Sequence, residues 1–190
     1  NVHFKILNNS TMDSVNAVKE GKVDLAFVST DLQVNKPLRM KKLREYHEVL
    51  IGGSRYIELK GRKISLEELS TYPWISLTSE ALTRKFLNNY FADHGLQFLP
   101  DMELATTDLI LPAVRHNLGI GFVPELEGKK TVYRMTPEEF AEEEKKAENV
   151  FEIEVEEKLP TRNIILIYDT EYPQSIASKE FQKFLSSQKN

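Results

Sequence analysis

Cysteine is absent from the 190 residues of the sequence. The chain therefore forms no disulfide bond, offers no thiolate to a metal and has no cysteine nucleophile. It also lacks a long apolar run, since a stretch such as residues 163–168 is far shorter than the roughly 20 residues that cross a bilayer. No basic segment followed by an apolar stretch stands at the N-terminus, so the sequence predicts neither a membrane span nor a signal peptide. We expect a cytoplasmic protein.

An excess of positive charge is absent as well. The 25 lysine and arginine residues are outnumbered by 29 acidic residues, which gives a formal net charge of −4. Nucleic-acid-binding domains usually carry a basic face, because phosphate neutralisation supplies much of their affinity. The basic residues here are spread out apart from one small cluster at 39–44, which a pocket or a salt-bridged surface explains as well as DNA does. We predict that this chain does not bind DNA directly.

Motifs of catalysis and of metal or cofactor binding are missing too. No H-E-x-x-H, no G-x-S-x-G elbow and no Walker lysine occurs. Gly119 and Gly121 lack the third glycine and the acidic residue of a dinucleotide site. The four histidines, none of them paired at metal-ligand spacing, are His3, His47, His94 and His116. The sequence therefore predicts a protein that is not an enzyme and that holds no metal and no cofactor.

What is present is an alternation of strand and helix patterns. The predicted strands cover residues 3–7, 23–28, 48–51, 74–77, 102–105, 120–123, 150–155 and 163–168. Six helices are predicted. The first is capped by Ser10 or Thr11 and closed by Gly21, and the second is a short helix with Ser65 and Glu68 as a capping box. The others cover residues 83–94, the stretch from Thr106 or Thr107 to Asn117, a stretch opened by Thr136 and Pro137, and residues 173–187. Residues 29–42 form a looser stretch that contains Pro37.

The alternation argues for an α/β protein with mainly parallel sheets. The first strand, helix and second strand form a β-α-β unit, which predicts that strands 3–7 and 23–28 are parallel. Two lobes are plausible, joined by extended crossings near 48–53 and 163–169.

Hydroxyl and amide side chains recur where predicted strands end and helices begin. They are Asn9, Ser10 and Thr11, then Thr78, Ser79 and Thr83, then Thr106 and Thr107. Helix capping explains each group by itself. The other interpretation is a ligand site, because α/β sheets bind ligands beyond the carboxyl ends of their strands and helix N-termini attract anions. Arg84 could pair with a ligand carboxylate there or simply point to solvent.

Four segments, in order, resemble one known family. "SVNAVKEGKVDLAFV" has a helix, a glycine and a "DLAI"-like strand, and "KGRKISLEELSTYPWISL" has a short "SL.DL" helix before a "P-[LFW]-I" strand. "ATTDLILPAVRHNLGIGFVP" resembles a capped helix followed by "V..GLGIA.LP", and "NIILIYD" precedes a helix containing "FQKFL". Together they resemble the effector-binding domain of LysR-type bacterial transcription regulators over most of the chain.

The resemblance implies a periplasmic-binding-protein-like (type II) fold, with two α/β lobes joined by a two-stranded hinge. Lobe I would comprise residues 1–53 and 163–190, and lobe II residues 54–162. A small effector, such as a carboxylate or another anion, would bind between the lobes and shift the conformation of a homodimer or tetramer. The implied effector-binding residues are Asn9, Ser10, Thr11, Thr78, Ser79, Thr83, Arg84, Thr106, Thr107 and Phe122, the last on the pocket floor.

Two departures from the family pattern stand out. The family's domain normally begins with a further strand and long helix, preceded by a winged helix-turn-helix that would bind DNA, and neither is expected here. "LEGKKTVYRM" is longer than the family's usual connection. Two rivals remain open at this point: a solute-binding protein of a transport system, and an enzyme such as a dehydratase on a related two-lobe fold.

Overall fold

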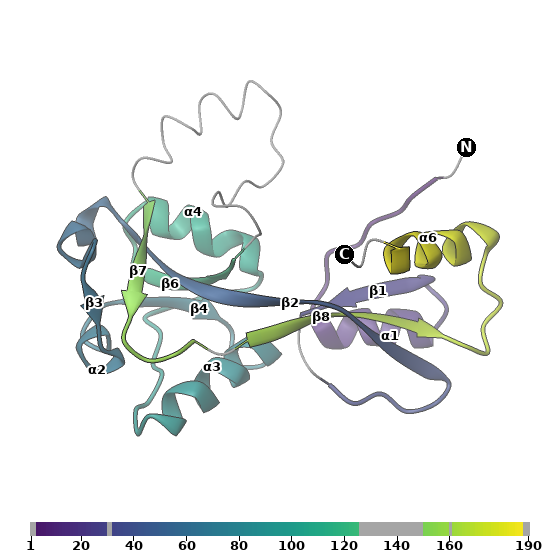
Figure 1. Ribbon diagram of the computed structural model, residues 1–190, viewed down its shortest axis with the longest axis horizontal. Helices are drawn as coiled ribbons and strands as arrows, with labels where there is room; N and C mark the ends of the chain where they lie inside the picture. The colour runs from purple at the N-terminus through teal and green to yellow at the C-terminus, as the bar shows by residue number, and fades with distance from the viewer. Residues whose placement is uncertain (1–2, 30–31, 126–149, 160, 188–190) are drawn as a thin grey trace. The chain divides into compact units, whose positions relative to one another are not determined.

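The computed structural model describes residues 3–29, 32–125, 150–159 and 161–187, and the chain divides into two compact units (Figure 1). Unit 1 takes the described residues of 1–45 and 162–190, and unit 2 those of 46–161. The helix predicted to open at Thr136 lies outside the described residues, as does the loop before it.

Unit 1 begins with helix α1, Thr11–Lys19. Ser10 caps it as predicted, because its Oγ accepts a hydrogen bond from the backbone N–H of Asp13 at 3.2 Å. The chain leaves the helix through Gly21, whose φ of +67° is the left-handed conformation that glycine adopts without strain. The start and the end of this helix are therefore both confirmed.

The sheet of unit 1 pairs β1, Leu25–Val28, antiparallel to β8, Thr161–Asp169. Helix α6, Ile176–Ser187, closes the chain. One face of the sheet packs on α1, since side chains of both strands meet apolar residues of the helix. This core consists of Val15, Val18, Ala26, Val28, Leu38, Ile165 and Ile167.

The strand predicted at residues 3–7 is wrong, and the parallel β-α-β unit with it. Residues 3–10 have no regular structure, and the side chains of Phe4 and Ile6 are 71% and 89% exposed. A segment becomes a strand only when its backbone N–H and C=O groups pair with a neighbour. Within the described part of the chain, β1 pairs with β8 alone, and that pairing is antiparallel.

Strand β2, Leu38–Gly53, is much longer than the predicted residues 48–51. It begins directly after Pro37, a position where the missing backbone N–H of proline costs no ladder hydrogen bond. Residues 38–42, expected in the looser stretch around Pro37, belong to this strand, and most of the charged residues at 39–45 lie exposed on it. Because β2 runs from unit 1 into unit 2, it is one of the two segments, with β8, that carry the chain between the units.

The described residues of unit 2 contain the other strands and three helices with two 3-10 turns. Their bounds are η1 Ser54–Leu59, β3 Lys63–Ile64, α2 Leu66–Leu69, β4 Trp74–Leu77, α3 Leu82–Asp93, β5 Met102–Leu104, η2 Thr107–Leu109, α4 Ile110–Arg115, β6 Ile120–Pro124 and β7 Val150–Val155. Strand β2 is antiparallel to β6 and β7, whereas β4 is parallel to β5 and β6, and β3 to β7. The α/β class is confirmed, but the sheet is mixed, so the expectation of mainly parallel sheets is wrong.

The core of unit 2 is built around Trp74, which donates its indole N–H to the carbonyl of Leu69 at 3.1 Å. Its ring stacks on Phe122 with centroids 5.4 Å apart and meets the edges of Phe91 and Phe98 at 5.4 and 5.3 Å. Phe122, predicted on the pocket floor, is 4% exposed and packs in this aromatic core.

Helices α3 and α4 cover opposite faces of the sheet of unit 2 (Figure 1). The face under α4 is aliphatic, with Ile75, Leu77, Ile110, Val114 and Val123 among its buried side chains. The turn from α4 into β6 is tight. A Cβ at Gly119 would lie 2.5 Å from the carbonyl oxygen of Pro73.

Replacing Phe122 by alanine should lower the free energy of unfolding by about 3–5 kcal/mol, because the change removes the stacking partner of Trp74 and leaves a cavity. The control, Leu99→Ala, truncates a side chain that is 71% exposed and should change it by less than about 0.5 kcal/mol. Urea denaturation followed by far-ultraviolet circular dichroism measures both. Similar losses for the two variants would contradict the core position of Phe122.

Candidate functional site

The carboxyl ends of β4 and β5 lie at one edge of unit 2. The two strands are parallel, with Leu77 opposite Leu104. The backbone N–H of Thr78 donates to the carbonyl of Leu104 at 3.1 Å, which extends the ladder beyond the last residue of β4. The hydroxyl residues that follow the two strands therefore lie side by side: Thr78 and Ser79 after β4, Thr106 and Thr107 after β5.

The two helix starts at this edge have no side-chain cap. Helix α3 begins after Ala81, whose methyl group cannot accept a hydrogen bond, and η2 begins after Thr106, whose side chain makes no capping bond. Capping therefore does not account for the hydroxyl of Thr106. Thr83 is the second residue of α3 and is half-buried, whereas Thr78 and Ser79 are exposed. This edge therefore carries polar side chains together with the N-terminal ends of α3 and η2, which are the positive ends of their dipoles.

The predicted polar cluster of unit 1, residues 9–11, has a different role. Ser10 accepts from the N–H of Asp13 and donates its own proton to Asp13 Oδ2 at 2.7 Å, so the capping interpretation is confirmed for this residue. Asn9 precedes it in the exposed N-terminal segment, and Thr11 is the first residue of α1. These three residues form a second, separate group on the other unit.

Arg84 is buried, so the alternative that it points to solvent is wrong. Its Nη1 donates to Glu103 Oε1 at 2.7 Å and to the carbonyl of Leu77 at 3.0 Å, and its Nε donates to Asn88 Oδ1 at 3.0 Å. The guanidinium lies 5.3 Å from the centre of the Phe98 ring. Sequence reasoning missed Glu103, because its 19-residue separation from Arg84 leaves no local pattern.

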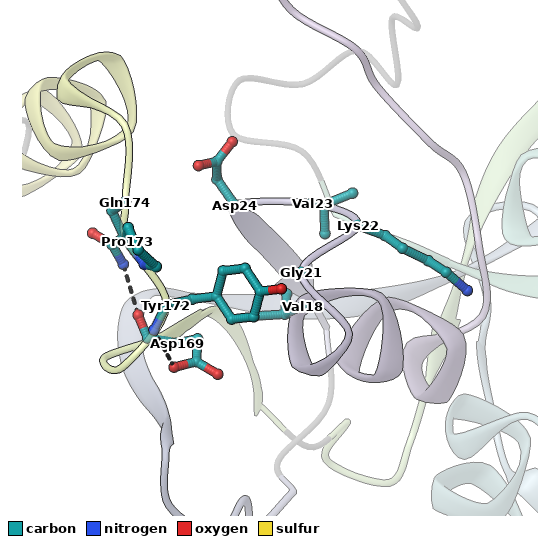
Figure 2. A pocket seen from close by; sticks show the side chains of 9 residues that line it. All are labelled: Val18, Gly21, Lys22, Val23, Asp24, Asp169, Tyr172, Pro173 and Gln174. Carbon is teal, nitrogen blue, oxygen red and sulfur yellow. Dashed lines mark hydrogen bonds between the residues drawn. The ribbon is translucent and has the colours of Figure 1, made fainter.

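A pocket of about 180 Å³ lies in unit 1, at the opposite end of α1 from Ser10 (Figure 2). It is lined by Val18, Gly21, Lys22, Val23, Asp24, Asp169, Tyr172, Pro173 and Gln174. Figure 2 shows the ring of Tyr172 beside Gly21, and the carboxyl groups of Asp24 and Asp169 pointing in different directions. The Lys22 ammonium is paired with Glu20 at 2.5 Å. The polar groups of this pocket do not converge, and no predicted site residue lines it.

The following features concern only the part of the chain that the structure describes. No group of three or more histidine, aspartate or glutamate side chains in that part of the chain is arranged to hold a metal ion. None of its helices is long and apolar enough to cross a membrane. Burial raises the pKa of Tyr90 to about 12, with a smaller contribution from Glu157, and lowers the pKa of Arg115. Neither group lies at the β4–β5 edge.

Comparison with known proteins gives the family. Residues 1–189 match the LysR substrate binding domain. The chain belongs to this family. The resemblance read from the four segments is thereby confirmed, and so is the expectation of a regulator's effector-binding domain rather than an enzyme. The same finding decides against the transport protein and against the dehydratase-like enzyme.

Individual relatives of this LysR substrate binding domain agree. The chain is 27% identical over 127 residues to the HTH-type transcriptional regulator CysB of Burkholderia cenocepacia, which covers 66% of the chain and 40% of that protein. The regulatory domain of CcmR from Synechocystis, solved in complex with 2-PG, has a TM-score of 0.75 at 17% identity, covering 100% of this chain and 84% of that one. The effector-binding domain of QuiR in complex with shikimate has a TM-score of 0.72 at 18% identity, covering 93% and 77%.

The different roles of the hydroxyls predict different costs of removing them. Ser10→Ala should lower the free energy of unfolding by about 1 kcal/mol, because the N–H of Asp13 loses its acceptor. Thr106→Ala should lower it by less than about 0.5 kcal/mol, since no capping bond is lost. Urea denaturation of both variants tests this, and a loss at Thr106 as large as that at Ser10 would show that its hydroxyl is a cap after all.

Proposed function

We propose that the edge formed by the carboxyl ends of β4 and β5 is the effector site of this LysR substrate binding domain, with Thr78, Ser79, Thr83, Thr106 and Thr107 as its ligand-contacting residues. The observation that carries the proposal is the hydrogen bond from Thr78 N to Leu104 O, because it brings two separate hydroxyl-rich strand ends to one place. Arg84 and Phe122 are left out of the contacting set, since both side chains are engaged inside unit 2.

The ligand we propose is a small carboxylate or another anion. Two helix starts without side-chain caps favour negative charge at this edge. Hydroxyls can donate to anionic oxygens without the cost of burying a cation. CcmR and QuiR, whose domains share this fold, were solved with 2-PG and with shikimate, so both compounds are sensible first probes.

We further propose that unit 1 and unit 2 are the two lobes that the sequence predicts. Ligand binding would favour one conformation of a homodimer or tetramer. The chain covers 40% of the length of CysB, and we propose that DNA binding belongs to a helix-turn-helix elsewhere in such a full-length cytoplasmic regulator.

The site predicts a separation between stability and binding. In a thermal-shift screen of 2-PG, shikimate, sulfate and small organic acids, at least one compound should raise the melting temperature of the chain, because a ligand that binds the folded state stabilises it. Thr107→Val should abolish that shift while leaving the melting temperature of the free protein nearly unchanged, since Thr107 is only half-buried.

Thr71→Val is the matched control. Thr71 lies before β4, at the amino end of the strand, where its hydroxyl donates to the carbonyl of Glu68. This variant should keep the ligand-induced shift. A full shift in Thr107→Val would remove Thr107 from the site, and loss of the shift in both variants would show that the effect is not local to the β4–β5 edge.

The charge of the chain generates a second prediction. With a net charge of −4, the chain should show no salt-sensitive binding to duplex DNA, because an acidic protein releases few counterions from the phosphates. Fluorescence anisotropy of a labelled duplex, titrated at low and moderate salt, measures this. Micromolar binding that weakens with salt would contradict the assignment of DNA binding to another part of the protein.

A further inference from the structure

Arg84 makes contacts that join three elements at the edge where the proposed site lies. It stands in the first turn of α3, and its Nη1 reaches the carbonyl of Leu77, the last residue of β4. The same nitrogen donates to Glu103, the middle residue of β5. One guanidinium therefore connects α3 with the ends of both parallel strands.

The burial of Arg84 makes these contacts obligatory. A buried cation without partners is costly, and here the charge is met by Glu103, whose side chain is 44% exposed while that of Arg84 is 9% exposed. Asn88, one turn further along α3, fixes Nε. Phe98 covers the face of the guanidinium at 5.3 Å, a contact that suits this planar and weakly hydrated group.

The partners of Arg84 border the hydroxyl residues on both strands. Leu77 directly precedes Thr78, and Glu103 is three residues before Thr106. If the guanidinium were absent, the carbonyl of Leu77 and the carboxylate of Glu103 would each lose a charge-assisted donor. The hydrogen bond from Thr78 N to Leu104 O lies next to these contacts, and it holds the hydroxyl residues after β4 close to those after β5.

We propose that Arg84 is a positioning residue that holds the β4–α3 turn against β5 and so sets the spacing of Thr78 and Ser79 from Thr106 and Thr107. The part of this inference that concerns ligand affinity rests on the proposed function, whereas the part that concerns the turn does not. Arg84 acts through the strand ends and does not itself contact the ligand.

Amide hydrogen exchange at Thr78 tests the positioning role directly, because this N–H is protected by the bond to Leu104. In Arg84→Met, exchange at Thr78 measured by NMR should be faster by roughly tenfold or more, the change expected when a charge-assisted hydrogen bond next to it is lost. Arg84→Lys should fall between wild type and Arg84→Met, since one ammonium cannot reproduce the guanidinium fork.

Two controls separate positioning from a general loss of stability. Lys85→Met removes the neighbouring cation on α3, which is exposed and lies 4.0 Å from Glu80, and should leave exchange at Thr78 unchanged. Ile64→Val weakens the buried core of unit 2 and should speed exchange across the whole unit without a special effect at Thr78. Exchange at Thr78 in Arg84→Met that matches the general increase in Ile64→Val would overturn the positioning role.

The effect of Arg84 on ligand affinity is tested with 2-PG and shikimate as probes. If either raises the melting temperature of wild type, its dissociation constant should increase roughly tenfold in Arg84→Met and less in Arg84→Lys, because part of its binding energy must reorder the turn. An unchanged constant alongside fast exchange at Thr78 would refute the link between the turn and binding. If neither these probes nor any other anion of the screen binds wild type, the proposed effector chemistry is contradicted, while the exchange data still decide whether Arg84 holds the turn.

Discussion

The parallel pairing of β4 with β5 and β6 is the constraint on which unit 2 depends. Because the strands run in one direction, every connection must return over a face of the sheet, and α3 and α4 cover the two faces in doing so. The same geometry places strand ends and helix starts at one edge. Packing and recognition are thus separated in space: Trp74 anchors the aromatic core from within β4, while polar side chains occupy the positions just beyond its end.

Caps, turns and strand bounds that depend on a few neighbouring residues could be predicted from the sequence. The cap at Ser10, the left-handed glycine at 21, the bounds of β4 and the start of α2 after Ser65 follow from patterns only a few residues long, and the structure confirms them. The family could be identified for a related reason, because its segments combine such local signals in a fixed order. The hydroxyl-rich strand ends belong to this class, and the structure brings those of β4 and β5 together.

Contacts between residues distant in sequence could not be predicted from the sequence. The segment at 3–7 has the composition of a strand, but a strand needs a partner, and composition does not supply one. Residues 38–42 were expected in the looser stretch around Pro37, but they belong to the start of β2. The stacking of Phe122 on Trp74 and the ion pair of Arg84 with Glu103 could not be predicted either. In each case the deciding contact joins residues distant in sequence.

The placement of Trp74 has an optical consequence. It is the single tryptophan of the chain and lies in unit 2, 2% exposed and surrounded by phenylalanine rings. Excitation at a wavelength that indole absorbs and tyrosine does not therefore yields fluorescence from Trp74 alone, in the buried core of unit 2. Any event that loosens unit 1 alone is silent in this signal, whereas opening of unit 2 lets water reach the indole and shifts its emission to longer wavelength. The protein thus carries a built-in probe that tells its two parts apart.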